Sequence, residues 1–390
     1  MPLSNRENYL RNARFEGPQW IPYLVCISDA SWDQWRAEME RVALSHPTIF
    51  PGIRPGWRDY NSYAFDLRHP AGDEFAHAFG PGHRAGEDLT DAWGCVWRGE
   101  IDGLEGLVVG HPLADWQALE AYSPPDPQVQ WDRQPADWQG AREQAEAAMA
   151  AGKLVSGGLP HGFFFLRLCD LRGFENLMLD MASEAPRLDR LIALVLAQSK
   201  AYLSGWLDLN LDVAELGDDL GAQTATIISP AKFARYIGPG YKALTDMCHE
   251  RGALVALHSD GYILDFVDEL VRIGIDILNP QDLVNGLDNL ARMVKGRMCV
   301  RLDIDRQSVV PFGSRQEIRQ LIEAEVRLLG SPQGGLELVC GIYPPTPPDN
   351  VDALCLAIEE FRTFWWDGQR PSVAPPRVTS KGDLSTLAMA

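Results

Sequence analysis

The apolar residues in the second part of the chain form short runs that recur at regular intervals. Few polar residues interrupt these runs, which is typical of strands buried on both faces of a parallel sheet. The runs are Leu154–Ser156, Leu211–Leu216, Ala253–His258, Ile275–Asn279, Met298–Asp303 and Leu336–Cys340, with a similar run at Ile21–Ile27. They predict seven strands, and an eighth is expected within the irregular first part of the chain.

Segments with helical spacing separate these runs. Helices are predicted over 174–207 (as two helices), 230–251, 262–273, 287–295, 314–329 and 349–366. The alternation of strand and helix predicts βαβ units. Polar residues follow the carboxyl ends of six runs, and in a closed barrel those ends meet at one mouth, whereas an open sheet gathers ligands at one switch point. The pattern favours an α/β fold of the (β/α)8 TIM-barrel type.

The first 150 residues have a weaker pattern, and we expect them to decorate the barrel. Helices are predicted over 4–14, 31–44 and 136–151, and a β-hairpin over 90–110 that turns near Asp102-Gly103. Residues 47–86 are rich in Gly, Pro and aromatic residues and are expected to form a long loop. Residues 1–370 are therefore predicted to form one domain, with 1–150 as its elaborated N-terminal region, 151–370 as the regular βα units and 371–390 as a loosely ordered tail.

Charge and composition narrow the choice of partner and compartment. The chain has 54 acidic and 35 basic residues and a formal charge of −19, which argues against binding to nucleic acid or anionic membranes. No apolar run reaches about 18 residues, and the N-terminus lacks the apolar core of a signal peptide. The seven cysteines are scattered singly, so reduced thiols and a cytoplasmic location are expected. The oligomeric state stays open.

A histidine, an aspartate and a cysteine at strand ends predict a metal site. His258 ends one apolar run and Asp260 lies two positions further on, so an extended backbone would point both side chains the same way. Cys340 ends another run. Imidazole, carboxylate and thiolate together suit zinc, with a fourth position open to substrate. The alternative is a hydrogen-bonded His–Asp pair and an inert buried cysteine.

The segment after the Leu211–Leu216 run carries candidate catalytic residues. Asp219 and Gln223 are predicted to act in catalysis, where the carboxylate would be a general base or a fourth metal ligand. The alternative is that this segment is a turn leading into a helix. Ser229-Pro230 is assigned to such a helix start, with the serine as the N-cap and the proline at the first position.

Two further strand ends carry candidates for substrate binding. Asn279 and Gln281 are predicted to bind substrate or to brace the histidine of the metal site. Asp303 is also predicted to bind substrate, and its alternative is a salt bridge to Arg301 or Arg306.

Several segments of the second half resemble the uroporphyrinogen decarboxylase-like superfamily. They are His258–Ile263, Ile273–Gln281, Arg301–Asp305, and Cys340–Ile342 with Pro347–Val351. The resemblance covers residues 210–365 well and Arg6–Pro22 loosely, and it implies a (β/α)8 barrel.

One branch of this superfamily comprises the true decarboxylases. Their porphyrinogen substrates carry many carboxylates, which an Arg-rich stretch after the first strand neutralises. Here that stretch is Ser28–Trp35, which contains two aspartates and no arginine before Arg36, so it would repel such a substrate. A decarboxylase of the uroporphyrinogen type is kept as an alternative, as is a non-catalytic binding barrel.

The other branch comprises corrinoid-linked methyltransferases, which bind zinc through His-x-Cys and a later Cys. His258 and Cys340 match the histidine and the later cysteine, whereas Asp260 replaces the middle cysteine. A carboxylate makes the site harder, which suits a substrate activated through oxygen, such as a methyl ether or methanol. The resemblance implies a methyltransferase that moves a methyl group between a small-molecule methyl donor and a corrinoid protein. Zinc would bind to the chain, and the corrinoid would come with the partner protein.

Overall fold

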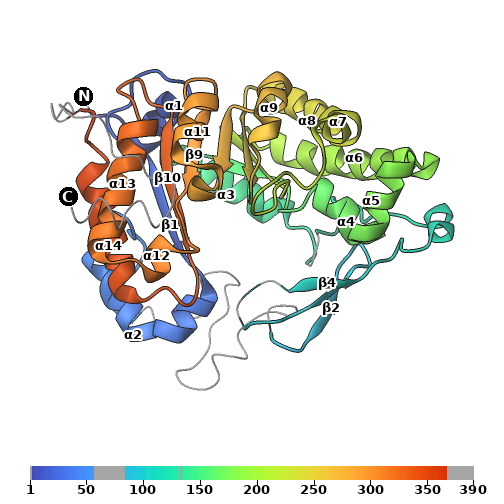
Figure 1. The fold of residues 1–390 in the computed structure, drawn as a ribbon, viewed down its shortest axis with the longest axis horizontal. Helices are drawn as coiled ribbons and strands as arrows, with labels where there is room; N and C mark the ends of the chain where they lie inside the picture. The colour runs from blue at the N-terminus through green and yellow to red at the C-terminus, as the bar shows by residue number, and fades with distance from the viewer. Residues whose placement is uncertain (1, 57–83, 103, 105, 132–133, 367–390) are drawn as a thin grey trace.

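A curled parallel sheet forms the centre of the molecule, as the computed structural model shows for residues 2–56, 84–102, 104, 106–131 and 134–366 (Figure 1). Its seven strands follow the order β1 (Tyr23–Ile27), β10 (Leu336–Ile342), β9 (Cys299–Asp303), β8 (Ile277–Pro280), β7 (Leu254–Ser259), β6 (Val213–Gly217), β5 (Ser156–Gly158). All neighbouring strands pair in parallel. The sheet confirms the predicted α/β fold of the TIM-barrel type.

The predicted eighth strand is not found within the described ranges. There, β1 and β5 form the two edges of the sheet, and no other strand joins them. An edge position of β1 agrees with its exposure, because Leu24 and Cys26 are exposed although they lie in a strand of the central sheet. The predicted tail over 371–390 and residues 57–83 of the predicted loop lie outside the described residues.

Helices join successive strands and cover the outside of the sheet (Figure 1). The longer ones are α1 (Asn5–Ala13), α2 (Asp29–Ser45), α3 (Trp138–Ala150), α4 (Phe165–Arg172), α5 (Phe174–Ser183), α6 (Pro186–Leu207), α8 (Gly238–Glu250), α9 (Val267–Ile273), α11 (Leu287–Met293), α13 (Arg315–Leu329) and α14 (Pro348–Phe361). Short turns of helix are η3 (Trp116–Glu120), α7 (Pro230–Lys232), η4 (Phe233–Ile237), η5 (Leu264–Phe266), α10 (Asp282–Asn285) and α12 (Val309–Phe312). None of the helices in the described part of the chain is long and apolar enough to cross a membrane.

Local hydrogen bonds explain where two of the predicted helices begin. The Ser229 side chain accepts a hydrogen bond from the Lys232 backbone and Pro230 opens α7, which confirms the predicted helix start. The helix predicted over 262–273 becomes regular only at Val267. The turn η5 precedes it, and Tyr262 and Ile263 stay outside the helix, where the Ile263 N–H donates to Asn285 Oδ1 at 3.0 Å.

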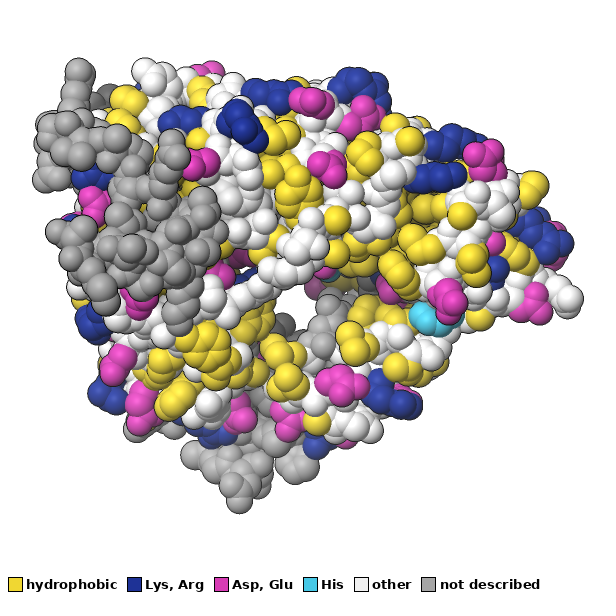
Figure 2. Space-filling view, in the orientation of Figure 1, with side chains coloured by type: hydrophobic (Ala, Val, Ile, Leu, Met, Phe, Trp, Pro, Cys, Tyr) yellow, Lys and Arg dark blue, Asp and Glu magenta, His cyan; other side chains and the backbone are white. Residues whose placement is uncertain are grey.

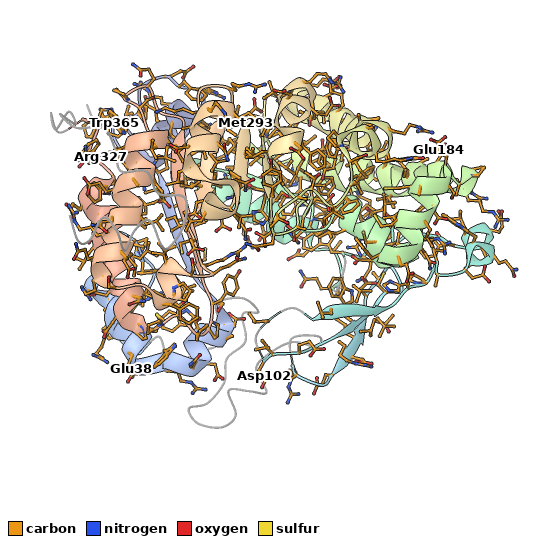
Figure 3. All side chains as sticks on the ribbon, in the orientation of Figure 1. Glu38, Asp102, Glu184, Met293, Arg327 and Trp365 are labelled. Atoms are coloured by element: carbon orange, nitrogen blue, oxygen red, sulfur yellow. The ribbon has the colours of Figure 1, made fainter. Side chains whose placement is uncertain are left out.

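A small antiparallel sheet projects from the barrel, with β2 (Asp88–Thr90), β3 (Val96–Arg98) and β4 (Leu107–Gly110) in that order. It contains the predicted hairpin, to which β2 adds a third strand. The buried carboxylate of Asp91 ties this sheet to α4, because it accepts from the Trp97 indole at 2.9 Å and from Arg167 at 3.2 Å. Asp102 marks the turn of the hairpin, across from Glu38 on α2 (Figure 3).

The inward-facing side chains of the curled sheet form layers. Val213, Ala256, Ile277 and Cys299 pack with Ala13 of α1 into an apolar floor. Arg301 lies above this floor and pairs with Glu215 and Glu337, each at 2.7 Å. Because side chains alternate between the two faces of a strand, residues two positions further along each strand face the same interior at the mouth.

Candidate functional site

His258 of β7 lies at the mouth with its ring held from one side. It pairs in register with Gly217 of β6 and Asn279 of β8. Its Nδ1 lies 2.9 Å from Asn279 Oδ1, while Asn279 Nδ2 donates to the Arg301 carbonyl at 2.6 Å. Since the Asn279 nitrogen is committed to a carbonyl, its oxygen accepts, so Nδ1 of His258 carries the proton and Nε2 faces the mouth. Asn279 thus makes the bracing contact to His258 that was the alternative to substrate binding, and its role toward substrate stays a prediction.

Carboxylates surround the Nε2 atom of His258. Asp260 Oδ1 lies 3.4 Å away and Asp219 Oδ1 3.8 Å away. Burial works to lower the pKa of His258, but the hydrogen bond and charge of Asp260, followed by Asp219 and Asp303, raise this pKa above its ordinary value. The ring therefore lies in a pocket that favours a positive charge.

A second histidine, which the sequence interpretation missed, joins this group. His161 follows β5, and its Nε2 lies 3.2 Å from Asp219 Oδ1. The same oxygen accepts the Asp260 backbone N–H at 2.9 Å. Burial works to raise the pKa of Asp219, but the hydrogen bond and charge of His161 outweigh it and hold the pKa below its usual value. A search three residues beyond the Gly157-Gly158 strand end would have found His161.

Arg306 closes the other side of the mouth. Its Nη2 lies 2.6 Å from Asp260 Oδ1 and 3.1 Å from Asp303 Oδ2, and its guanidinium lies 5.4 Å from the centre of the Tyr343 ring. Burial raises the pKa of Asp303 to about 6, although Arg306 opposes this shift. Asp303 thus forms the salt bridge that was the alternative to substrate binding, and its role toward substrate stays a prediction.

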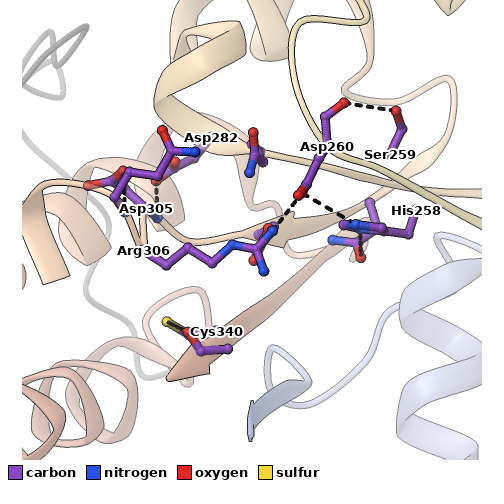
Figure 4. Close-up of polar contacts among 12 residues, drawn as sticks. His258, Ser259, Asp260, Asp282, Asp305, Arg306 and Cys340 are labelled. Carbon is purple, nitrogen blue, oxygen red and sulfur yellow. Dashed lines mark hydrogen bonds and ion pairs between the residues drawn. The ribbon is translucent and has the colours of Figure 1, made fainter. Parts of the chain in front are cut away.

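Cys340 does not join the other two predicted metal ligands in this structure (Figure 4). The register places Glu337 beside the inward-facing Arg301, so Cys340, three residues later, faces the opposite side of the strand. Burial raises the pKa of its thiol well above the usual value, and Asp303 and Asp282 add to this effect. Among the described residues, His161, Asp219 and His258 are the group whose ligand atoms all lie within 4.8 Å of one another.

Other polar residues near the mouth have structural partners. Gln281 is buried and accepts a backbone N–H from the loop after β7 at 2.9 Å, whereas Gln223 is exposed on the loop after β6. Asp218 is buried beneath the site, where it accepts the first backbone N–H groups of α4 and the Tyr241 hydroxyl. Asp305 accepts backbone N–H groups at the start of α12. The catalytic role predicted for Gln223 and the substrate contact predicted for Gln281 stay predictions.

A cavity of about 510 Å³ opens beside His161 and Asp219. Its walls come from the small sheet, from α4 and from the loops of the mouth, and Figure 2 shows this face hollowed between barrel and small sheet. Apolar and aromatic side chains make up much of the lining: Trp97, Leu107, Val108, Leu166 and Phe174, with His111, Asp170, His161 and Asp219 as polar members.

Comparison with known proteins places the chain in a family. The profile described as Uroporphyrinogen decarboxylase (URO-D) matches residues 165–361. A solved methyltransferase from Methanosarcina mazei superposes with a TM-score of 0.61 at 16% identity, over 91% of this chain and 98% of that one. A xylose isomerase-like TIM barrel protein from Mycobacterium smegmatis gives a TM-score of 0.28 at 14% identity, over 58% and 90%. No curated protein matches the sequence. The chain belongs to the uroporphyrinogen decarboxylase (URO-D) family.

Proposed function

We propose that this chain is a corrinoid-dependent methyltransferase that moves a methyl group between a small methylated substrate and a corrinoid protein. The observation that carries the proposal is a mouth where two imidazoles and a carboxylate converge beside a cavity of about 510 Å³. Carboxylates and imidazoles attract a metal cation, and the apolar walls suit a neutral substrate. The corrinoid would arrive on the partner protein.

The charge of the mouth favours this function over decarboxylation of a porphyrinogen. Asp219, Asp260 and Asp303 all lie at the mouth, and Arg306 is already paired with two of them. A substrate with several carboxylates would need arginines that are free to bind it. Within the described part of the mouth, the negative charge would instead repel such a substrate.

The size and lining of the cavity also distinguish between the two methyl donors considered for an oxygen-containing ligand set, methanol and a methyl ether. Methanol would fill roughly 60 Å³, on the scale where a water molecule fills about 30 Å³. The cavity is many times larger and has Trp97, Leu166 and Phe174 in its walls. It therefore suits a methyl ether with an apolar, ring-sized body.

The chain's residues would position and polarise such an ether. A divalent metal, when bound, supplies a Lewis acid for the ether oxygen, and the corrinoid supplies the nucleophile for the methyl group. As the methyl–oxygen bond breaks, the oxygen gains negative charge, which the metal would balance, while Arg306, paired with Asp260 and Asp303, reduces the negative charge of the mouth around it. The apolar walls exclude water from the reacting groups.

A labelled methyl group tests this proposal. The purified, metal-loaded protein is incubated with free cob(I)alamin and either a methoxybenzene or methanol, each labelled in the methyl group. We expect label on the cobalamin, with an equal amount of phenol, from the methoxybenzene and little transfer from methanol. Release of CO₂ from uroporphyrinogen without methyl transfer would instead establish the decarboxylase alternative.

A further inference from the structure

We infer that His161, Asp219 and His258 form a divalent-metal site at the barrel mouth and that Cys340 is not one of its ligands. This inference depends on the proposed function only for the use made of the metal, because metal binding can be measured without methyl transfer. The three ligands come from neighbouring parts of the sheet: the segment after β5, the segment after β6 and the end of β7.

The distances between the ligand atoms fit a shared metal ion. Two ligands at about 2.0–2.1 Å from a tetrahedral metal are roughly 3.3 Å apart. His161 Nε2 lies 3.2 Å from Asp219 Oδ1, and His258 Nε2 lies 3.8 Å from the same oxygen. The two imidazole rings are 5.6 Å apart between centroids. All three ligand atoms lie within 4.8 Å of one another, and a bound ion would draw them closer together.

Neighbouring groups hold two of the ligands ready. Asn279 fixes the His258 tautomer with the Nε2 lone pair toward the mouth, because the Asn279 amide is itself fixed by the Arg301 carbonyl. The Asp260 backbone N–H holds Asp219 Oδ1 at 2.9 Å. Such outer contacts orient metal ligands and raise affinity.

The other two residues predicted as metal ligands, Cys340 and Asp260, are less well placed to bind this ion. Cys340 lies on the opposite face of β10, and Asp260 Oδ1, although 3.4 Å from His258 Nε2, is paired more closely with Arg306 at 2.6 Å. The site that results has two nitrogen donors and one oxygen donor, a set that suits zinc, iron(II), manganese(II) or cobalt(II) and leaves a position for a substrate oxygen.

Gly217 supports the site by having no side chain. It lies beside His258 in register, and a Cβ atom there would come within 2.8 Å of Cδ2 of His161. Gly217→Ala should therefore displace the His161 ring and weaken metal binding although all three ligands remain.

Cobalt(II) is the probe that separates this site from a cysteine site. Co²⁺ is titrated into the metal-free full-length protein, and its visible and near-ultraviolet absorption is recorded. We expect one equivalent with visible bands and no sulfur-to-cobalt charge-transfer band. Cys340→Ser should leave the spectrum and affinity unchanged, whereas His161→Ala, Asp219→Asn and His258→Ala should each lower affinity by at least about tenfold.

A matched control uses another exposed His–Asp pair. His249 Nε2 of α8 lies 2.8 Å from Asp276 Oδ2, which also accepts the Val255 N–H at the start of β7, away from the mouth. His249→Ala therefore removes a similar pair and should leave Co²⁺ affinity unchanged. Thermal melting checks that each variant folds, and the half-exposed His161 gives an informative variant even if Asp219→Asn does not fold.

The inference is overturned if the wild type binds no Co²⁺, if a sulfur charge-transfer band appears, or if Cys340→Ser loses the metal. Stoichiometric Co²⁺ in the absence of any methyl transfer would support the metal site and count against the proposed function alone.

Discussion

Asn279 sets the tautomer and the ring orientation of His258 at the mouth. Its amide nitrogen donates to the Arg301 carbonyl, so its oxygen receives the Nδ1 proton of His258. Without this acceptor the ring could rotate and present the other nitrogen. The side chain would thus act on the proposed metal site through His258 rather than by binding the ion.

Asn279→Ala should lower metal affinity by about 10–100-fold while the ligands stay in place. Competition between the protein and a chromophoric chelator for Zn²⁺ measures the change. Asn289→Ala is the control, because the Asn289 side chain donates to the Asn285 carbonyl and accepts from Arg292 rather than contacting a proposed metal ligand. Equal zinc affinities for wild type and Asn279→Ala would show that the brace has no effect on the metal.

Exposure separates Cys26 from the other six thiols, which are all buried. A thiol-specific reagent should therefore modify one cysteine rapidly in the native protein, even though burial of its sulfur raises the pKa of Cys26. Cys26→Ser should remove the fast phase of the reaction, and Cys340→Ser should leave it intact. A fast phase that disappears in Cys340→Ser would contradict the buried position of that thiol.

At the scale of the strand, alternation explains what could and could not be predicted. The runs that end at His258, Asn279 and Asp303 are strands, and their inward faces carry polar residues at the mouth. Cys340 also ends a predicted run, but β10 continues to Ile342 and its inward position at that level falls on Gly341. The sequence pattern located the strand, whereas the face of each residue depends on the register with β9, which a single sequence does not show.

Arg301 of β9 joins three elements in the interior of the barrel. It pairs with Glu337 of β10 and Glu215 of β6, and it also contacts the hydroxyl of Tyr9 on α1. Arg301→Met should lower the free energy of unfolding by about 3–5 kcal/mol, because it leaves the buried Glu337 without a partner. Urea denaturation measures this change. Arg251→Met, which breaks an exposed pair with Asp208, should change stability by about 1 kcal/mol or less.

For the molecule as a whole, long-range contacts were the part that the sequence pattern could not provide. His161 and His258 belong to separate βα units and meet only because β5, β6 and β7 are neighbours in the sheet. The same is true of the cavity, whose walls combine the small sheet with α4. The order of elements predicted the fold class, but the packing of the N-terminal elaboration against the mouth depends on contacts such as Asp91 with Arg167.

Buried acids between the sheet and α13 should make the stability of the whole molecule depend on pH. Both oxygens of Glu325 are buried, and its carboxyl group interacts with that of Asp282. Burial, followed by the charge of Asp282, raises the pKa of Glu325 well above its usual value, and burial raises the pKa of Asp282 to about 7. Both groups bind protons more tightly in the folded chain than in the unfolded chain. Their contribution to stability is therefore complete below about pH 4 and is lost as the pH rises toward 7 and above.

Glu325→Gln removes the titrating carboxyl group with little change in side-chain shape. The variant should gain unfolding free energy relative to the wild type mainly at the higher pH. At pH 8 the variant should exceed the wild type in unfolding free energy by about 1–3 kcal/mol, because the buried position no longer has to hold an acid against deprotonation. At pH 5 the unfolded carboxyl is itself partly protonated, so the difference should shrink. Urea denaturation at both pH values tests this prediction. The control is Glu360→Gln, which changes an exposed glutamate that pairs with Arg319. A difference between Glu325→Gln and wild type that is the same at pH 5 and pH 8 would mean that Glu325 does not carry the pH dependence.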